Sequence, residues 1–446
     1  MSVPVPFREA LRTWFRIGLE SFGGPAGQIA VMHRVLVEEK RWIGEERFLH
    51  ALSYCMLLPG PEAQQLATYI GWLLHRTRGG LAAGLLFVVP GTIVMAALAL
   101  LYAAYGSVPF VAALFFGVKA AVLALVVEAL IRIGRRALRG RAHAVLAFAA
   151  FVALFCFAVP YPWIVVAAAA IGLALERITP GASAGAGSTD SAATLDALLD
   201  RDVPGHARPS LARALRVAAL WLGIWLAPVV ALYTLLGPSH VMTRIALFFS
   251  QLAVITFGGA YAVLAYVAQR AVVDFGWLTP GQMLDGLGLA ETTPGPLILV
   301  LQFVAQLAAW REPGALAPWA ASLLAGGLAL WVTFAPCFLW IFVGAPWIEA
   351  LRGSRALRGA LAGITAAVVG VVLNLAVWFS LHVLFDRVEA TSAGVLRLHL
   401  PVWSTLSPAA LAITLAAGVA TLRFHVGMFP LLAASAVAGL IVQWRP

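Results

Sequence analysis

Proline- and glycine-rich interruptions within apolar segments are the residues of this sequence best suited to hold a substrate. Pro59-Gly60-Pro61 and Pro294-Gly295-Pro296 repeat the same three residues far apart in the chain. Proline removes a backbone donor and glycine permits non-helical dihedral angles, so each segment is expected to split into two half-helices or a re-entrant hairpin. A half-helix that starts after such a break presents unpaired N–H groups and the positive end of its dipole, which suits an anion.

Polar side chains beside these breaks extend the candidate site. Gln64 and Gln65 follow within one turn of Pro61 and could donate hydrogen bonds to an oxyanion, whereas the corresponding positions after Pro296 are apolar. A second pair of interruptions, at Gly23-Gly24 and Gly258-Gly259, could serve the site or could only allow close helix packing. The predicted substrate-binding residues are Gly23, Gly24, Pro59, Gly60, Pro61, Gln64, Gln65, Lys119, Gly258, Gly259, Thr293, Pro294, Gly295 and Pro296.

Charged residues inside apolar segments are costly and therefore informative. Lys119 lies near the middle of the apolar stretch Pro109 to Ile131. It could attract a dianionic substrate, or it could pair with a carboxylate such as Glu20 or Glu291. Glu291, Glu62 and Glu20 are the candidates for proton coupling, with helix capping as the alternative for Glu62 and an interfacial position as the alternative for Glu20.

Catalytic and cofactor motifs are absent from the sequence. It contains no dinucleotide fingerprint, phosphate loop, zinc-ligand spacing or haem motif. Cys55, Cys156 and Cys337 lie far apart inside apolar segments, without the spacing of a metal site. We therefore expect no metal, no cofactor and no enzymatic activity.

The composition indicates which solvent surrounds these motifs. Of 446 residues, 62% are hydrophobic and only 11% are charged, against roughly 25% charged residues in soluble domains. Uncharged runs such as Leu81 to Ala104 and Leu316 to Gly344 exceed the roughly 20 residues that cross a bilayer. Because lipid cannot satisfy backbone groups, such runs must be helical, and the sequence predicts an all-α polytopic membrane protein. The net charge of +10 comes from arginines in short loops, which indicates topology and not nucleic-acid binding.

The motifs belong to an internal duplication. Phe22-Gly23-Gly24 recurs at Phe257-Gly258-Gly259, Trp42 recurs at Trp277, and the two Pro-Gly-Pro motifs match, all at an offset of 235. Gly117 to Val122 matches Gly363 to Val368 at an offset of 246, and Tyr161 to Leu173 resembles Met428 to Leu440. We predict a first repeat over residues 1–177, a cytoplasmic linker over 178–213, a connecting transmembrane helix over 214–240 and a second repeat over 241–446.

Arginine clusters predict that the two repeats have opposite orientations. A cluster at Arg132 to Arg141 follows the Gly117 helix, whereas the matching helix of the second repeat is preceded by Arg352, Arg355 and Arg358. Since loops rich in arginine stay cytoplasmic, the equivalent helices run in opposite directions, as in the inverted repeats of secondary transporters. About 13 membrane segments are expected, some of them broken or re-entrant.

Three stretches carry a family resemblance. Ser21-Phe-Gly-Gly-Pro-Ala-Gly27, Leu57-Leu-Pro-Gly-Pro-Glu-Ala-Gln-Gln65 and Glu291-Thr-Thr-Pro-Gly-Pro296 resemble the chromate transporter family of the long, two-domain type. The resemblance covers nearly the whole chain. It implies a multi-pass protein of the bacterial inner membrane that exports chromate and so confers chromate resistance. The resemblance also implies that export is coupled to the proton motive force, as in an antiporter.

Several alternatives remain open at the level of sequence. The substrate could be sulfate, a dianion of similar shape, and the transporter could instead be a passive anion channel that uses the same half-helix dipoles. A membrane-embedded enzyme that reduces chromate would need a redox cofactor, for which no motif is present. The expected partners are the dianion, protons and the lipid bilayer, without nucleic acid, and a homodimer is one candidate assembly.

Overall fold

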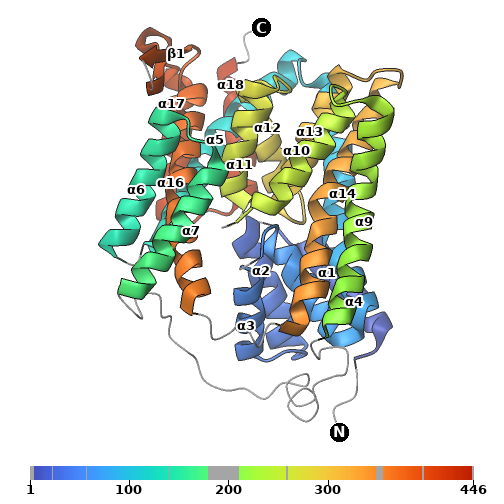
Figure 1. The fold of residues 1–446 in the computed structure, drawn as a ribbon. Helices are drawn as coiled ribbons and strands as arrows, with labels where there is room; N and C mark the ends of the chain where they lie inside the picture. The colour runs from blue at the N-terminus through green and yellow to red at the C-terminus, as the bar shows by residue number, and fades with distance from the viewer. Residues whose placement is uncertain are drawn as a thin grey trace. The chain divides into compact units, whose positions relative to one another are not determined.

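The computed structural model describes residues 5–22, 24–56, 58–138, 140–178, 210–257, 260–347, 355–393 and 396–443. Most of these residues are helical (Figure 1). The chain forms two compact units, and each unit collects three stretches of sequence: Met1–Ala97, Ala184–Ala260 and Thr293–Ser354 form unit 1, and Leu98–Ser183, Tyr261–Thr292 and Arg355–Pro446 form unit 2.

Unit 1 contains both Pro-Gly-Pro motifs. Its elements are α1 (Phe7–Glu20), α2 (Gly24–His33), the π-helix η1 (Arg34–Glu39), α3 (Glu45–Cys55), the first part of α4 (Glu62–Tyr105), α9 (Leu211–Leu236), α10 (Val241–Ile255), the short helix η3 (Leu297–Leu299), α13 (Val300–Arg311), α14 (Pro318–Gly344) and η4 (Ala345–Trp347).

Unit 2 contains the buried charges. Its elements are the end of α4, α5 (Pro109–Ala137), α6 (Arg141–Phe157), α7 (Tyr161–Ile178), α11 (Ala260–Ala268), the π-helix η2 (Gln269–Asp274), α12 (Pro280–Thr292), α16 (Arg355–Leu384), β1 (Val388–Ala393), β2 (Leu396–Pro401), η5 (Trp403–Thr405), α17 (Pro408–Phe424) and α18 (Met428–Gln443). The antiparallel β1–β2 hairpin pairs Val388 with Pro401 and is a small departure from the expected all-helical chain.

The helices confirm the all-α polytopic membrane fold. Among the described residues, six helical stretches are long and apolar enough to cross a bilayer: Glu62–Tyr105, Pro109–Arg135, Tyr161–Ile178, Leu211–Leu236, Pro318–Trp347 and Gly359–Leu384. Shorter apolar helices accompany them. The count of about 13 segments and the inverted orientation remain predictions, and most of the predicted linker lies outside the described residues.

The long helix α4 is interrupted, which the sequence did not predict. His75 (φ −137°, ψ 30°) and Arg76 (φ 55°, ψ −151°) leave the helical conformation. The two sides of this break lie against each other, because a Cβ atom on Gly71 would lie 2.5 Å from the carbonyl oxygen of Gly79, and one on Gly84 would lie 2.7 Å from Nε2 of Gln64. The half-helix that starts after Pro61 therefore turns back at His75 as a helical hairpin.

Backbone irregularities recur at the offset of 235 that the predicted duplication has. The π-helix Arg34–Glu39 corresponds to the π-helix Gln269–Asp274. Beyond each π-helix, Trp42 N–H donates to the Leu36 carbonyl and Trp277 N–H donates to the Ala271 carbonyl, both at 2.8 Å. Because π-helices are rare, their recurrence at equivalent positions supports a common origin of the two stretches.

Glycine contacts in unit 2 also come in an equivalent pair. A Cβ atom on Gly117 of α5 would lie 1.7 Å from the Ser435 carbonyl and 3.0 Å from the Gly439 nitrogen of α18, and one on Gly363 of α16 would lie 2.8 Å from Cα of Gly172 on α7. Gly363 is the predicted equivalent of Gly117, and Gly439 is that of Gly172. Each of the two contacts therefore joins one helix from each predicted repeat. The glycines allow the two backbones to approach closely, as small residues do between the helices of membrane proteins.

Candidate functional site

The two Pro-Gly-Pro motifs are joined to the opposite repeat by a reciprocal pair of hydrogen bonds within unit 1. Gly60 N–H donates to the Thr256 carbonyl at 2.9 Å, and Gly295 N–H donates to the Ser21 carbonyl at 2.7 Å. Gly295 is the equivalent of Gly60, and Thr256 is the equivalent of Ser21, at the same offset of 235. Ser21 and Thr256 each lie directly before a Phe-Gly-Gly motif. The structure therefore brings the interrupted segments of both repeats together at one crossing.

The glycines at this crossing have conformations that other residues rarely adopt. Gly60 has φ +118° and Gly295 has φ +92°, in the region that favours glycine. Space is also limited, because a Cβ atom on Gly60 would lie 2.9 Å from Sγ of Cys337, and one on Gly91 would lie 1.9 Å from the Pro294 carbonyl oxygen. Helices α4 and α14 thus pack directly against the motifs.

Gln28 completes the crossing and was missed by the sequence analysis. Its buried side chain donates from Nε2 to the Gly295 carbonyl at 2.8 Å. The equivalent position in the second repeat is Val263, so only one motif receives this side-chain bond. The asymmetry at offset 235 was readable in the sequence, but the contact was not, because residues 28 and 295 meet only in the folded chain.

Gln64 and Gln65 lie fully buried at the start of α4. Gln65 donates from Nε2 to the Pro59 carbonyl at 2.8 Å, and Gln64 donates from Nε2 to Oγ1 of Thr68 at 3.1 Å. Their Oε1 atoms have no hydrogen-bond partner among the described residues. Each amide nitrogen carries two N–H groups and one acceptor is given for each, so a second N–H of each side chain could still donate to an oxyanion.

Three other predicted residues of unit 1 lie at helix starts or beside the second Pro-Gly-Pro motif. Gly24 begins α2 with φ +70°, Glu62 begins α4, and Thr293 is buried beside Pro294. Gly23, Gly258 and Gly259 lie outside the described residues. The predictions for those three glycines are therefore not addressed by the structure.

Lys119 lies in unit 2, and its partner differs from the carboxylates considered from the sequence. Its Nζ lies 3.4 Å from Oδ2 of Asp285, and the hydroxyl of Tyr102 donates to the same oxygen at 2.6 Å. Neither Glu20 nor Glu291 fills that role. Asp285 was overlooked, although a carboxylate in an apolar stretch is the same signal that identified Lys119.

Glu291 follows Asp285 on the same helix, α12. It is buried and accepts a hydrogen bond of 2.7 Å from the hydroxyl of Tyr261 on α11. Two buried carboxylates of unit 2 are therefore each held by a tyrosine, and the structure gives a close cation for Asp285 but a neutral donor for Glu291.

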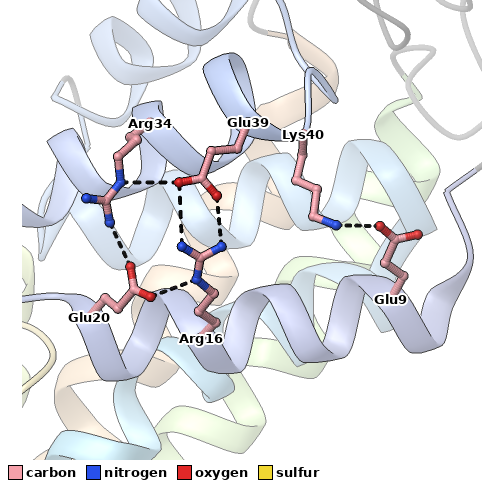
Figure 2. A network of polar contacts seen from close by, with 6 residues as sticks. All are labelled: Glu9, Arg16, Glu20, Arg34, Glu39 and Lys40. Atoms are coloured by element: carbon pink, nitrogen blue, oxygen red, sulfur yellow. Dashed lines mark hydrogen bonds and ion pairs between the residues drawn. The ribbon is translucent and has the colours of Figure 1, made fainter.

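Glu20 belongs to an exposed network of ion pairs in unit 1. Arg16 of α1 contacts Glu20 at 2.7 Å and Glu39 of η1 at 2.8 Å, while Arg34 also contacts Glu20 at 2.7 Å (Figure 2). Lys40 contacts Glu9 at 2.7 Å beside them. The hydrogen bond from Arg16 lowers the pKa of Glu39 below its ordinary value. These pairs tie α1 to η1.

The described residues include no candidate metal centre. They contain no group of three His, Cys, Asp or Glu side chains placed to hold a metal ion. Cys55 and Cys337 are buried free thiols, and Cys156 is half-buried.

Comparison with known proteins identifies the relatives of this chain. The family described as chromate transporter matches residues 8–173 and 243–440. A chromate transport protein of Pseudomonas aeruginosa is 33% identical over 88% of this chain and 85% of its own length. A probable chromate transport protein of Synechococcus elongatus is 27% identical (85% and 86% of the two chains), and a chromate transport protein of Cupriavidus metallidurans is 26% identical (87% and 86%). No solved structure matches this chain. With the family matched over most of its length, the chain belongs to the chromate transporter family.

Proposed function

We propose that this protein is a secondary transporter that exports chromate across the bacterial inner membrane and so confers chromate resistance. The observation that carries the proposal is the reciprocal crossing of Gly60 with Thr256 and of Gly295 with Ser21. It gathers the interrupted segments of both repeats in unit 1. Broken backbone at membrane depth is tolerated only where protein buries it or a polar cavity receives it, and transporters use such breaks as ion sites.

The anion would bind at the helix start after Pro61. The first N–H groups of α4, at Glu62 and beyond, and the positive end of its dipole favour a negative charge there. Gln64 and Gln65 would contribute the second N–H of each amide, since the first already binds Thr68 or Pro59. The Pro296 side offers the apolar Leu297, Ile298 and Leu299 instead, so the two halves of the crossing would have unequal roles.

Coupling to protons would use a buried carboxylate. Glu291 is the strongest of the three predicted candidates, because it is buried and is held by the neutral hydroxyl of Tyr261. Glu62 lies at a helix start, where helix capping is its alternative role. Glu20 is committed to the exposed network with Arg16 and Arg34, which favours a structural role.

The direct test is uptake by everted membrane vesicles. Vesicles that contain the protein should accumulate labelled chromate when a proton gradient is imposed, and those with Glu291→Gln should lose gradient-driven accumulation. Glu312→Gln, which changes an exposed carboxylate of unit 1, is the control. Uptake equal to that of vesicles without the protein would rule out the export of chromate.

A passive anion channel and a sulfate transporter are separated by the same preparation. A channel would equilibrate chromate without accumulating it against a gradient. Sulfate in excess should compete poorly if chromate is the physiological substrate. Strong competition, with faster uptake of labelled sulfate, would instead assign the protein to sulfate.

A further inference from the structure

Asp285 is a buried carboxylate with unused hydrogen-bonding capacity. Its side chain is 4% exposed. Oδ2 accepts the Tyr102 hydroxyl and faces Lys119, whereas Oδ1 has no hydrogen-bond partner among the described residues. A buried ion pair needs complete hydrogen bonding to offset the loss of hydration, and this pair lacks it. Structural stability alone is therefore a poor reason for its presence.

The two partners are held unequally. Tyr102 fixes the Asp285 carboxylate at 2.6 Å, but Lys119 approaches it only to 3.4 Å, longer than the 2.7–2.9 Å typical of a charge-assisted hydrogen bond. The Lys119 side chain is 28% exposed. Gly281 lies close to the ammonium group, because a Cβ atom there would be 3.2 Å from Nζ, so a side chain at this position would crowd Lys119. An anion can therefore reach Lys119 far more easily than a cation can reach Asp285.

We propose that Asp285 is a built-in anion that competes with the transported oxyanion for Lys119. When the transporter is empty, Lys119 pairs with Asp285 and the buried charges are balanced. When an oxyanion binds to Lys119, it displaces the carboxylate, which stays bonded to Tyr102. This inference deepens the proposed function and rests on it, adding Lys119 and Asp285 of unit 2 as a substrate-responsive pair.

The pair determines which states can change conformation. A lone buried lysine is costly within a bilayer, so an empty transporter without Asp285 would resist reorientation, whereas one loaded with an anion would not. Asp285 is therefore needed for net transport, in which the empty protein must return, but not for exchange of one anion for another. Lys119 is needed for both.

The experiment compares net efflux with exchange in liposomes that contain the purified full-length protein. Labelled chromate is loaded inside, and its loss is followed into medium with or without unlabelled chromate. For Asp285→Asn we expect exchange within about twofold of wild type and net efflux reduced about tenfold or more, and for Lys119→Met we expect both to be lost. Asp274→Asn and Lys40→Met change a carboxylate and a lysine that form exposed ion pairs, and both should behave as wild type.

Each outcome decides the inference. Net efflux by Asp285→Asn at the wild-type rate overturns it, and so does loss of exchange in a variant that elutes and unfolds as wild type does. If Asp285→Asn does not fold, Asp285→Glu places the carboxylate nearer Lys119 and should weaken chromate binding about fivefold, measured by the shift of the unfolding temperature with chromate concentration. Unchanged binding by Asp285→Glu overturns the inference. Wild-type protein that exchanges no chromate overturns the proposed function itself, and this inference with it.

Discussion

Gly60 joins two constraints at a single residue, a positive φ and a short distance to a neighbouring side chain. Its φ is +118°, and an added Cβ atom would lie 2.9 Å from Sγ of Cys337 and 3.0 Å from Nε2 of Gln65. Its N–H also bonds Thr256 of the other repeat. A substitution here therefore strains the backbone and loosens the crossing together.

For Gly60→Ala we expect a loss of about 1–3 kcal/mol in stability, the usual range for a strained backbone conformation, and a marked loss of chromate transport. Gly223→Ala is the control, because Gly223 is exposed on α9 with no atom within 4 Å of an added Cβ. That change should leave stability equal or raise it by up to about 1 kcal/mol. Thermal unfolding in detergent and vesicle uptake measure the two effects; equal behaviour of both variants would contradict this account.

At the residue scale, the sequence predicts which residues are special more reliably than it predicts what they touch. Lys119 was identified because a cation in an apolar segment is costly, but its partner Asp285 lies 166 positions away, and no local pattern links them. Gln64 and Gln65 were expected to donate to a ligand, and the fold uses one N–H of each amide for Thr68 and Pro59, which the sequence did not predict. Contacts of this kind depend on tertiary packing.

Among the elements, α1 and η1 are held together mainly at their exposed faces. Arg16, Glu20, Arg34 and Glu39 alternate in charge across the two helices (Figure 2). Exposed pairs of this kind are weakened by salt. Because Arg16 lowers the pKa of Glu39, the pair stabilises the folded state above the ordinary carboxylate pKa and stops doing so as the pH falls through the lowered pKa.

Glu39→Gln should therefore unfold at a lower temperature than wild type near neutral pH. The difference should shrink as the pH falls below the ordinary pKa of Glu39, 4.5, and it should also shrink in high salt. Unfolding temperatures of both proteins across this pH range provide the measurement. A difference that grows toward acidic pH would be inconsistent with the ion pair.

The contact between α7 and α16 depends on small residues. A Cβ atom on Gly363 would lie 2.2 Å from the Ala168 carbonyl oxygen, and a backbone atom cannot move aside as a side chain can. For Gly363→Ala we expect a loss of about 1–3 kcal/mol, as for other overpacked contacts. Gly418→Ala on α17, where an added Cβ meets no atom within 4 Å, should show no such loss in the same unfolding assay.

Element types were largely predictable, and so were the interruptions at the two Pro-Gly-Pro motifs, whereas the break inside α4 and the β1–β2 hairpin were not predicted. Apolar length predicts the membrane helices directly, because lipid leaves the backbone few other choices. The break at His75 and Arg76 lies in the polar run His75 to Arg78, directly before Gly79-Gly80, so the local sequence carried a signal that the prediction missed. The β1–β2 hairpin was missed in the same way, although Leu396-Arg397-Leu398-His399-Leu400 alternates apolar and polar residues as a strand does.

At the scale of the whole molecule, the compact units are not the sequence repeats. Unit 1 and unit 2 each take residues from both predicted repeats. The Gly60–Thr256 and Gly295–Ser21 bonds belong to unit 1, and the Gly117–Gly439 and Gly172–Gly363 contacts belong to unit 2. Neither repeat contains a complete unit.

We therefore expect that neither half of the chain folds alone. Cutting within the predicted linker 178–213 and producing both halves in the same cell should restore chromate transport, whereas either half alone should be degraded or aggregate. Immunoblots of membrane fractions and vesicle uptake measure the two results. A stable, active single half would show that the interleaving of the repeats is dispensable.

The crossing at the Pro-Gly-Pro motifs also constrains any protein that carries only one repeat. Such a chain would have one donor, the equivalent of the Gly60 N–H, and one acceptor, the equivalent of the Ser21 carbonyl. In this protein, each of the two hydrogen bonds joins residues of different predicted repeats. It could close the crossing only by pairing with a second chain about a two-fold axis. In this protein, both halves of the crossing lie in a single polypeptide, as the predicted duplication requires, and Gln28 at the position equivalent to Val263 is one residue at which the two halves differ.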